Sequence, residues 1–258
     1  MKKNKKERLL ELVERTLDEV MPAAAERPAK LHEAMRYAVG AGGKRIRPLV
    51  CLAAAEAVGG KASDAKYPAA AIELLHNYTL IHDDLPAMDN DTMRRGKPTV
   101  WKKFGEANAI LAGDAMLALA YRVAAMTPRN AARVVDMLGR GGVNVVRGQV
   151  EDVAKGRDVD YIYANKTAAL FVTAAVMGGL AAGATPAQVK KLVLFGHYLG
   201  LAFQYQDDLL DGDSSLDREE VENRANEATF AALASLEKLK GDVSFLDGLV
   251  RGLMGRTI

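Results

Sequence analysis

The sequence contains one cysteine and few aromatic residues. Because Cys51 is alone, the chain can form neither an internal disulfide nor a zinc site built from several cysteines, which suits a reducing compartment such as the cytoplasm. Aromatic residues make up 6% of the chain and prolines number only 8, whereas runs of alanine recur. Strands favour aromatic and β-branched residues, and helices favour alanine. The composition therefore favours an all-α fold.

The chain also lacks an excess of charge of either sign. Its Lys+Arg count of 35 against an Asp+Glu count of 33 leaves a net charge of +2, which provides no general field for attracting nucleic acid or an anionic membrane. The uncharged stretch 167–189 consists mostly of alanine and glycine and contains Pro186, so it is a poor membrane span. We therefore expect a buried helix there, no nucleic-acid partner and no stable membrane insertion.

Apolar residues recur at intervals of three and four along most of the chain, and no segment shows convincing alternation of period two. This pattern predicts an all-α bundle of about ten helices. No linker-like composition divides the chain, so residues 1–258 are expected to form a single domain. The expected helices lie at roughly 6–20, 30–40, 47–58, 66–85, 104–125, 130–150, 160–182, 187–211, 217–239 and 243–255.

Two of the expected helices end in paired aspartates, each followed by a third carboxylate. On the second helix Asp207 and Asp211 share one face, where like charges repel and the helix C-terminus disfavours anions. A cation would offset both effects, and Mg²⁺ binds a few carboxylates together with substrate phosphates. Pro86 interrupts the first helix, so Asp89 can fold back towards Asp83. The predicted metal ligands are Asp83, Asp84, Asp89, Asp207, Asp208 and Asp211.

Two short basic runs accompany the aspartates. Arg94-Arg95-Gly96-Lys97 follows the first cluster, and Gly42-Gly43-Lys44-Arg45-Ile46-Arg47-Pro48 places a flexible turn before a helix. Arginine matches phosphate oxygens bidentately, and backbone N–H groups near a helix N-terminus add donors. Either run alone is typical of a surface turn. Together with two acidic clusters they predict a cavity for a polyphosphate and a metal ion.

The two basic and two acidic motifs stand in a fixed order with three further segments along the chain. The full series is Gly42-Gly43-Lys44-Arg45-x-Arg47-Pro48, Asp83-Asp84-x₄-Asp89 with Arg94-Arg95-Gly96, residues 104–115, Gly148-Gln149, Lys166-Thr167 and Phe203-Gln204-x₂-Asp207-Asp208-x₂-Asp211. With these motifs the chain resembles the head-to-tail trans-isoprenyl diphosphate synthases, and most closely their bacterial farnesyl type. The resemblance covers roughly residues 30–213 and implies an isoprenoid synthase-like bundle around a central active-site cavity, a homodimer, and a cytoplasmic location.

The resemblance implies two substrates. An allylic diphosphate would bind through Mg²⁺, three ions per active site, and isopentenyl diphosphate would bind beside it. The implied allylic site includes Arg94, Lys166, Thr167 and Gln204, and the implied isopentenyl site Lys44, Arg47, His76 and Arg95. His76 could instead be an ordinary core histidine. The catalytic residues implied are Asp83, Asp84, Asp89, Arg94, Lys166, Asp207 and Asp208.

Product length is expected to depend on the side chains that precede Asp83 on its helix. Tyr78 is large and lies five residues before Asp83, whereas Thr79 is smaller. In this family a bulky aromatic at that place resembles the farnesyl type, so we expect Tyr78 and Thr79 to limit the cavity and the product to be C15 farnesyl diphosphate. The alternatives are C20 geranylgeranyl and C10 geranyl diphosphate.

The chain departs from the family pattern in two short stretches, near Gly156-Arg157 and Asp213-Ser214. Either the loops there are deleted, or the sequence leaves out mobile loop residues. Deletion would favour a non-catalytic partner subunit, although both aspartate motifs and Lys166-Thr167 are intact. A class I terpene cyclase is a further alternative, but it needs no isopentenyl site and so no Gly-Lys-Arg-x-Arg motif.

Overall fold

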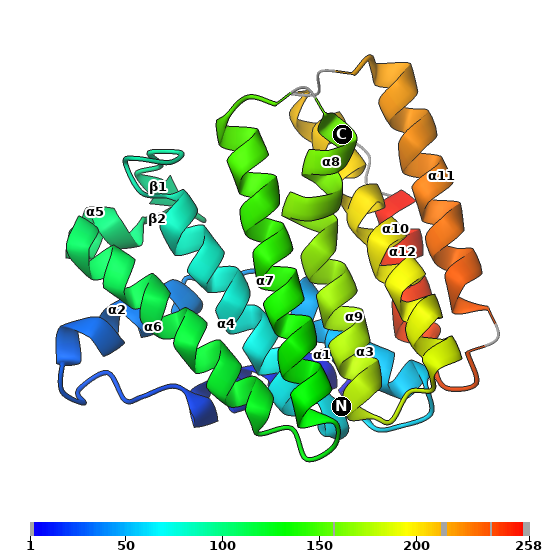
Figure 1. The fold of residues 1–258 in the computed structure, drawn as a ribbon, viewed down its shortest axis with the longest axis horizontal. Coiled ribbons are helices and arrows are strands. Elements are labelled where there is room, and N and C mark those ends of the chain that lie inside the picture. Colours follow the sequence, from blue (N-terminus) through cyan, green and yellow to red (C-terminus); the bar gives the residue numbers. More distant parts are fainter. Residues whose placement is uncertain (1–2, 157, 213–215, 238, 255–258) are drawn as a thin grey trace.

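A computed structural model describes residues 3–156, 158–212, 216–237 and 239–254, and these residues form a bundle of α-helices (Figure 1). The helices are α1 (Lys5–Val20), α2 (Ala29–Gly40), α3 (Ile46–Ala57), α4 (Lys66–Asp83), α5 (Val100–Phe104), α6 (Glu106–Ala125), α7 (Ala131–Val153), α8 (Val159–Ile162), α9 (Ala169–Ala181), α10 (Pro186–Asp211), α11 (Arg218–Leu236) and α12 (Ser244–Met254). A 3-10 turn, η1, spans Ala62–Ala65, and a π-helical segment, η2, spans Tyr163–Ala168. Arg157 and Asp213–Ser215 lie outside the described residues, at the two stretches where the chain departs from the family pattern.

Local sequence sets the ends of the long helix α10. Thr185 caps its N-terminus, and its side chain accepts from the backbone N–H of Gln188, whose own side chain accepts from the cap backbone. Pro186 occupies the first turn, where its missing N–H costs nothing. Gly212 ends the helix with φ of 73°, a conformation that glycine adopts without strain. The helix expected over 187–211 is confirmed.

The core surrounds α9, whose side chains are nearly all buried. A Cβ on Gly178 would lie 1.9 Å from the carbonyl oxygen of Cys51, so the missing side chain lets α9 approach α3 closely. The stretch Val159–Ala181 is long and apolar enough to cross a membrane by length and composition, but 72% of its most apolar window is buried inside the bundle. This agrees with the buried helix expected there. Most buried apolar side chains of the described residues form one cluster.

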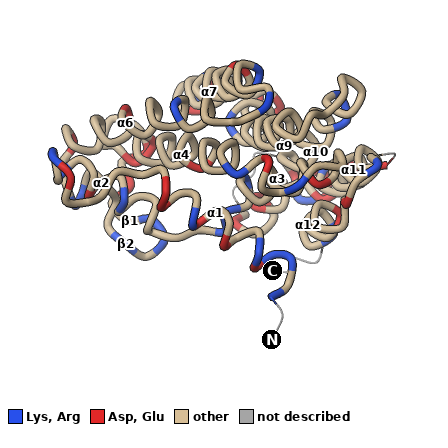
Figure 2. Tube along the Cα trace, turned by 90° about the horizontal axis from the view of Figure 1, so that it is seen from below, with Lys and Arg blue, Asp and Glu red and all other residues tan. Residues whose placement is uncertain are grey.

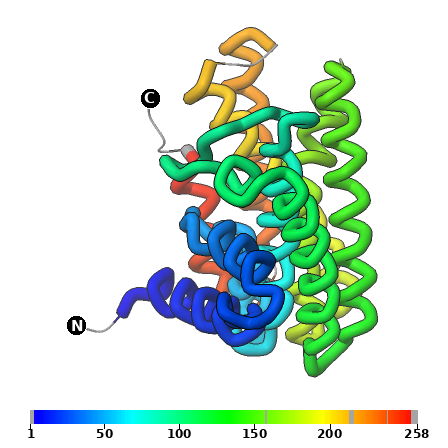
Figure 3. Tube along the Cα trace, turned by 90° about the vertical axis from the view of Figure 1, so that its left-hand side faces the viewer, coloured from blue at the N-terminus to red at the C-terminus, as the bar shows by residue number. Residues whose placement is uncertain are grey.

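The C-terminal ends of α4 and α10 lie at the same end of the bundle, the upper end in Figure 1. The C-terminal end of α7 and the short helix α8 are found there too. Basic and acidic residues are interspersed along the trace (Figure 2). Helix α7 forms one edge of the molecule (Figure 3). The arrangement therefore brings both aspartate motifs to one end.

Three details of the predicted helices were wrong. Residues 93–98 form a hairpin of two antiparallel strands, β1 (Met93–Arg94) and β2 (Lys97–Pro98), where no strand was expected. The helix expected at 104–125 is interrupted at Gly105, whose φ of 87° separates α5 from α6. The helix expected at 160–182 consists of α8, the π-helical segment η2 and α9. The break at Gly105 and the π-helical segment leave the three-to-four spacing of apolar residues largely intact, so the sequence pattern does not reveal them.

Candidate active site

The first aspartate motif begins where α4 ends. Asp83 is its last residue, and the turn after Pro86 brings the chain back, so that the backbone N–H of Asp89 donates to the carbonyl oxygen of Asp83 at 2.9 Å. The expected return of Asp89 towards Asp83 is therefore confirmed in the backbone. Asp84 caps the helix and is buried, whereas Asp89 is exposed.

The β1–β2 hairpin carries Arg94 onto this motif. Its Nε donates to Oδ1 of Asp84 at 2.7 Å, and its NH2 group lies 2.5 Å from the same oxygen and 3.3 Å from Oδ2 of Asp91. At the hairpin tip Arg95 and Gly96 both have positive φ, as a two-residue hairpin turn requires. Arg94 and Asp84 therefore form a partly buried pair that closes the loop over the end of α4.

Burial raises the pKa of the Asp83 carboxyl to about 6. The neighbouring carboxylates Asp89 and Asp84 add to this rise, and the cations Lys166 and Arg94 oppose it. The nearby cations thus do not fully offset the cost of burying the negative charge of Asp83. A divalent cation bound to the carboxylate would offset it. The donor set suits Mg²⁺, although in the part of the chain that the structure describes no three His, Cys, Asp or Glu side chains already form a metal site.

The second motif ends α10. Asp208 is buried and its two oxygens accept from different residues: Oδ2 from the Tyr163 hydroxyl at 2.6 Å, and Oδ1 from Nε2 of Gln204 at 2.9 Å. Thr167 in turn donates to Oε1 of Gln204 at 2.7 Å. Thr167 and Gln204 were predicted to contact the allylic substrate. In the structure Gln204 orients Asp208, and Thr167 holds Gln204. Asp211 is exposed at the helix end.

The π-helical segment η2 presents Lys166. Its backbone passes so close to α7 that a Cβ on Gly148 would lie 2.3 Å from the Lys166 backbone nitrogen. From this position the Lys166 ammonium pairs with Asp152 of α7. The same ammonium lowers the pKa of Asp83, so it lies near the first motif as well. Lys166 therefore stands at the end of the bundle where α4 and α7 meet.

The basic residues predicted for isopentenyl diphosphate line one cavity of about 400 Å³. In it, NH1 of Arg47 lies 3.2 Å from Nε2 of His76, and the guanidinium stacks 4.8 Å from the centre of the Phe171 ring. Burial lowers the pKa of Arg47 to about 10, and it also holds the pKa of His76 well below its usual value, with Arg47 as the next cause. A guanidinium only donates, so His76 accepts and is neutral. The cavity also contains Lys44, Arg95, Glu73 and Phe203.

Arg47 has a buried polar atom that no described residue satisfies. Its Nε is buried and has no hydrogen-bond partner among the described residues. A buried donor left unpaired costs free energy, so an anion in this cavity would be stabilised by it. The side chain of Arg95 reaches back to the same cavity, where it donates to the carbonyl oxygen of Gly42.

Arg45, in the same motif, has a different role. It is buried with φ of 50°, and its guanidinium pairs with Glu73 at 2.7 Å and Glu14 at 2.8 Å. A third bond at 2.7 Å goes to the carbonyl oxygen of Val39. These bonds join α1, α4 and the end of α2 beneath the cavity. Arg45 therefore stabilises the turn that presents Lys44 and Arg47.

A largely apolar cavity of about 510 Å³ runs from Asp83 along α4 and faces α7. Tyr78 and Thr79, the two residues predicted to limit the product, line it together with His82 of α4. A second hollow of about 420 Å³, also lined by Tyr78, continues between α6 and α7. Tyr78 thus stands between the two spaces.

The chain matches a known family over most of its length. The family model for polyprenyl synthetases covers residues 28–239. The chain belongs to the polyprenyl synthetase family. It is 44% identical over 219 residues to the chloroplastic heterodimeric geranylgeranyl pyrophosphate synthase large subunit 1 of Arabidopsis thaliana, covering 78% of this chain and 58% of that protein. It is 40% identical over 245 residues to geranylgeranyl pyrophosphate synthase 4 of the same plant, covering 90% and 65%.

Solved structures of the polyprenyl synthetase family have the same fold. The geranylgeranyl pyrophosphate synthetase of the archaeon Geoglobus acetivorans superimposes with a TM-score of 0.87 at 30% identity, covering 98% of this chain and 100% of that one. The geranyltransferase of Legionella pneumophila gives 0.88 at 31% identity, with coverages of 98% and 96%. The expected isoprenoid synthase-like bundle is therefore confirmed.

Three residues of this polyprenyl synthetase site were missed in the sequence. Asp152 pairs with Lys166, Tyr163 holds Asp208, and the buried Glu73 anchors Arg45. Asp152 lies three residues after Gln149 in the Gly148-Gln149 motif, and that spacing could have indicated it. Glu73 is the only carboxylate of its apolar helix before Asp83 at the helix end, a pattern that suggests a buried ion pair. Tyr163 carries no such signal.

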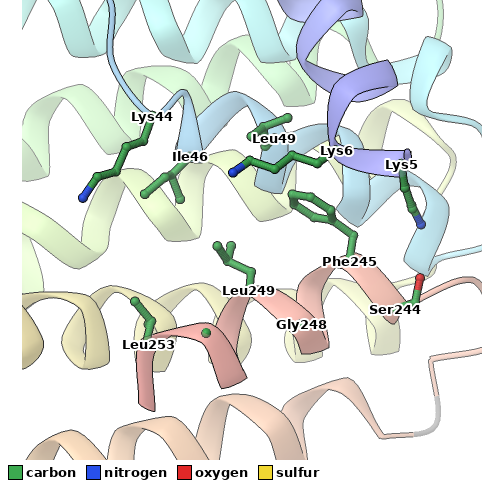
Figure 4. Close-up of a pocket in the computed structure, with 11 residues that line it drawn as sticks. Lys5, Lys6, Lys44, Ile46, Leu49, Ser244, Phe245, Gly248, Leu249 and Leu253 are labelled. Carbon is green, nitrogen blue, oxygen red and sulfur yellow. The ribbon is translucent and has the colours of Figure 1, made fainter. Parts of the chain in front are cut away.

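A further groove of about 470 Å³ lies between α1, α3 and α12 (Figure 4). Lys44 and Ile46 line both this groove and the basic cavity, while Phe245, Leu249 and Leu253 form its apolar wall. None of the six motif aspartates lines it. We therefore assign the chemistry to the end of the bundle that carries the aspartates.

Proposed function

We propose that this protein is a short-chain isoprenyl diphosphate synthase, which condenses isopentenyl diphosphate head-to-tail with an allylic diphosphate. The observation that carries the proposal is the cavity in which Arg47, His76, Lys44 and Arg95 gather. Against the lowering by burial, the charge of Asp207 raises the pKa of Arg47 and that of Asp84 raises the pKa of Arg95, so this cavity lies near both aspartate motifs. Its unpaired Arg47 donor suits a diphosphate, and the under-compensated Asp83 suits a metal-bound one. Family membership supports the same reaction.

In this proposal the allylic C–O bond breaks, and the released diphosphate carries away the bonding electrons. The double bond of isopentenyl diphosphate then attacks the allylic cation, a new C–C bond forms, and a proton is lost to the released diphosphate. Asp83, Asp84, Asp89, Asp207, Asp208 and Asp211 would hold Mg²⁺, three ions by the family pattern, which would supply positive charge to stabilise the departing diphosphate.

The chain's own residues then have separate tasks. Arg94 and Lys166 add fixed positive charge near the first motif, and Arg47 and Lys44 hold the second substrate. The apolar cavity below Asp83 accepts the hydrocarbon tail and excludes water, which would otherwise trap the cation as an alcohol.

For the product we propose C20 geranylgeranyl diphosphate, the alternative to the farnesyl product expected from the sequence. Support comes from relatives at 40–44% identity that are named geranylgeranyl pyrophosphate synthases or the large subunit of one. A C15 product is the second candidate, and the observation that favours it is the bulky Tyr78 between the two spaces. Chromatography of the dephosphorylated products decides between C20 and C15.

We also propose a homodimer. Large apolar side chains are exposed on adjoining faces of α6 and α7, an arrangement that marks a protein interface. They are Ile110, Leu111, Val143, Val146, Val150 and Val153. Leu111, 58% exposed, lines none of the cavities described above, so Leu111→Lys should lower the mass measured by light scattering to that of a monomer. An unchanged dimer would place the interface elsewhere, and a monomeric wild type would contradict the dimer.

Two other functions remain to be separated from this one: a non-catalytic partner subunit and a class I terpene cyclase. A synthase releases pyrophosphate from geranyl diphosphate rapidly only when isopentenyl diphosphate is present. A cyclase releases it without isopentenyl diphosphate, and a non-catalytic subunit releases none in either case. The cytoplasmic location stays a prediction.

A further inference from the structure

The side chain of His82 is held between two neighbours. On one side lies Tyr78, whose ring centre is 4.9 Å away with the planes at 69°, an edge-to-face contact. On the other side is α6, where Nε2 of His82 lies 3.1 Å from the carbonyl oxygen of Ile110. A carbonyl oxygen only accepts, so Nε2 carries the hydrogen and donates. These contacts fix the orientation of the imidazole.

Gly113 of α6 makes this position possible. A Cβ on Gly113 would lie 2.1 Å from Nε2 and 2.4 Å from Cδ2 of His82, far inside van der Waals contact. Glycine in a helix costs about 1 kcal/mol relative to alanine, so helix formation alone would favour alanine at this position. The absence of a side chain at Gly113 lets the imidazole lie against the α6 backbone.

The position of His82 matters because the residues that hold it, Tyr78 and Ile110, line the tail cavity together with His82. This cavity begins at Asp83. Tyr78 also lines the second hollow. Anything that displaces the imidazole from α6 must therefore move it towards Tyr78 or into the space for the tail.

We propose that His82, seated on Gly113 and packed against Tyr78, is a residue that determines product chain length by fixing where Tyr78 blocks the cavity. The inference rests on the proposed synthase function and extends it to residues outside the aspartate motifs. His82 acts through Tyr78 and through the width of the cavity, so it is a positioning residue and takes no part in bond breaking.

The geometry predicts opposite effects for two substitutions. His82→Ala removes the ring, widens the cavity and releases Tyr78, so the ratio of longer to shorter products should rise by roughly 2- to 10-fold, the effect expected from losing one aromatic contact. Gly113→Ala pushes the imidazole into the cavity, so the same ratio should fall. In the double variant the added methyl group meets no ring, so its products should match those of His82→Ala.

The experiment incubates the full-length protein with Mg²⁺, geranyl diphosphate and isopentenyl diphosphate, and separates the dephosphorylated products by chromatography. Gly139→Ala is the matched control: it is the same substitution within a helix, but its Cβ would meet only Tyr121, at ordinary distances of 3.4 Å from the hydroxyl and 3.8 Å from Cε1. Melting temperatures check that each variant is folded. If Gly113→Ala does not fold, His82→Ala and the double variant still test the proposal.

The outcomes separate this inference from the proposed function. A wild-type protein that makes no prenyl product would overturn the proposed function. An active wild type whose product ratio is unchanged by His82→Ala would overturn the role of His82 alone. The role of Gly113 would be overturned if Gly113→Ala shifted the ratio equally with and without the imidazole.

Discussion

The hydroxyl of Tyr163 donates a hydrogen bond of 2.6 Å to Oδ2 of Asp208 and so joins the π-helical segment η2 to the second aspartate motif. Asp208 is buried, and Gln204 holds its other oxygen. The carboxylate is therefore oriented by two partners. Groups that orient a ligand carboxylate commonly tune the affinity of a metal site.

Removing this hydroxyl should weaken the response to Mg²⁺. We expect Tyr163→Phe to raise the Mg²⁺ concentration needed for half-maximal condensation by about 10-fold or more, the usual cost of losing an outer hydrogen bond to a metal ligand. The ring remains, so its edge contact with Tyr205 at 5.5 Å should keep the fold. Tyr161→Phe, two residues away on an exposed ring, is the control. Equal Mg²⁺ curves for both variants would contradict this role.

The raised pKa of Asp83 predicts that, without bound metal, the free energy of unfolding is lower at neutral pH than at acidic pH. The folded protein holds this proton up to about pH 6, whereas an unfolded chain releases it near its ordinary value of 3.8. The Asp83 contribution to the free energy of unfolding therefore falls as pH rises from 4 to 6 and stays low above that range. Asp83→Asn should accordingly be more stable than the wild type at pH 7 in a chelator. Denaturant titrations that show no such gain, or a gain that persists at pH 3.5, would argue against the burial of this charge.

The Gly-Lys-Arg-x-Arg motif should divide into structural and binding positions. Arg45→Met leaves Glu73 as an unpaired charge that is 2% exposed, so unfolding should become easier by about 3–5 kcal/mol, as when a buried ion pair loses one partner. Lys44→Met, on an exposed side chain that lines the cavity, should leave the melting temperature nearly unchanged and raise the KM for isopentenyl diphosphate. The two roles would be refuted if both variants lost stability equally.

Tyr78 should limit the length of the product. Tyr78→Ala would join the cavity of about 510 Å³ to the hollow of about 420 Å³ on its other side, so longer products should appear. Their distribution is read by chromatography after dephosphorylation. If Tyr78→Ala gives the same product distribution as the wild type, another residue limits the product length.

The sequence predicts the helical architecture and both aspartate motifs, because these depend on residues that are close together in the chain. Spacing of apolar residues locates the long helices, and Pro86 alone indicates the turn that returns Asp89 to Asp83. The hairpin at 93–98 was missed because two-residue strands are too short to show alternation.

The partners of the site residues could not be predicted in the same way. Tyr163, which bonds Asp208, begins the π-helical segment η2, and such a segment changes the face that each following side chain occupies. Arg45 and Arg47 look equivalent in the motif, yet the left-handed backbone at Arg45 directs it into the core and leaves Arg47 in the cavity. Such roles depend on backbone conformation and on distant helices.

The most direct test of the account is to incubate the purified protein with Mg²⁺, dimethylallyl diphosphate and isopentenyl diphosphate and to identify the products. We predict successive condensation to longer prenyl diphosphates, and a loss of orders of magnitude in turnover for Asp83→Ala and for Asp207→Ala, with the helical circular dichroism spectrum unchanged. Near-normal condensation by either variant, or no condensation by the wild type, would contradict the account.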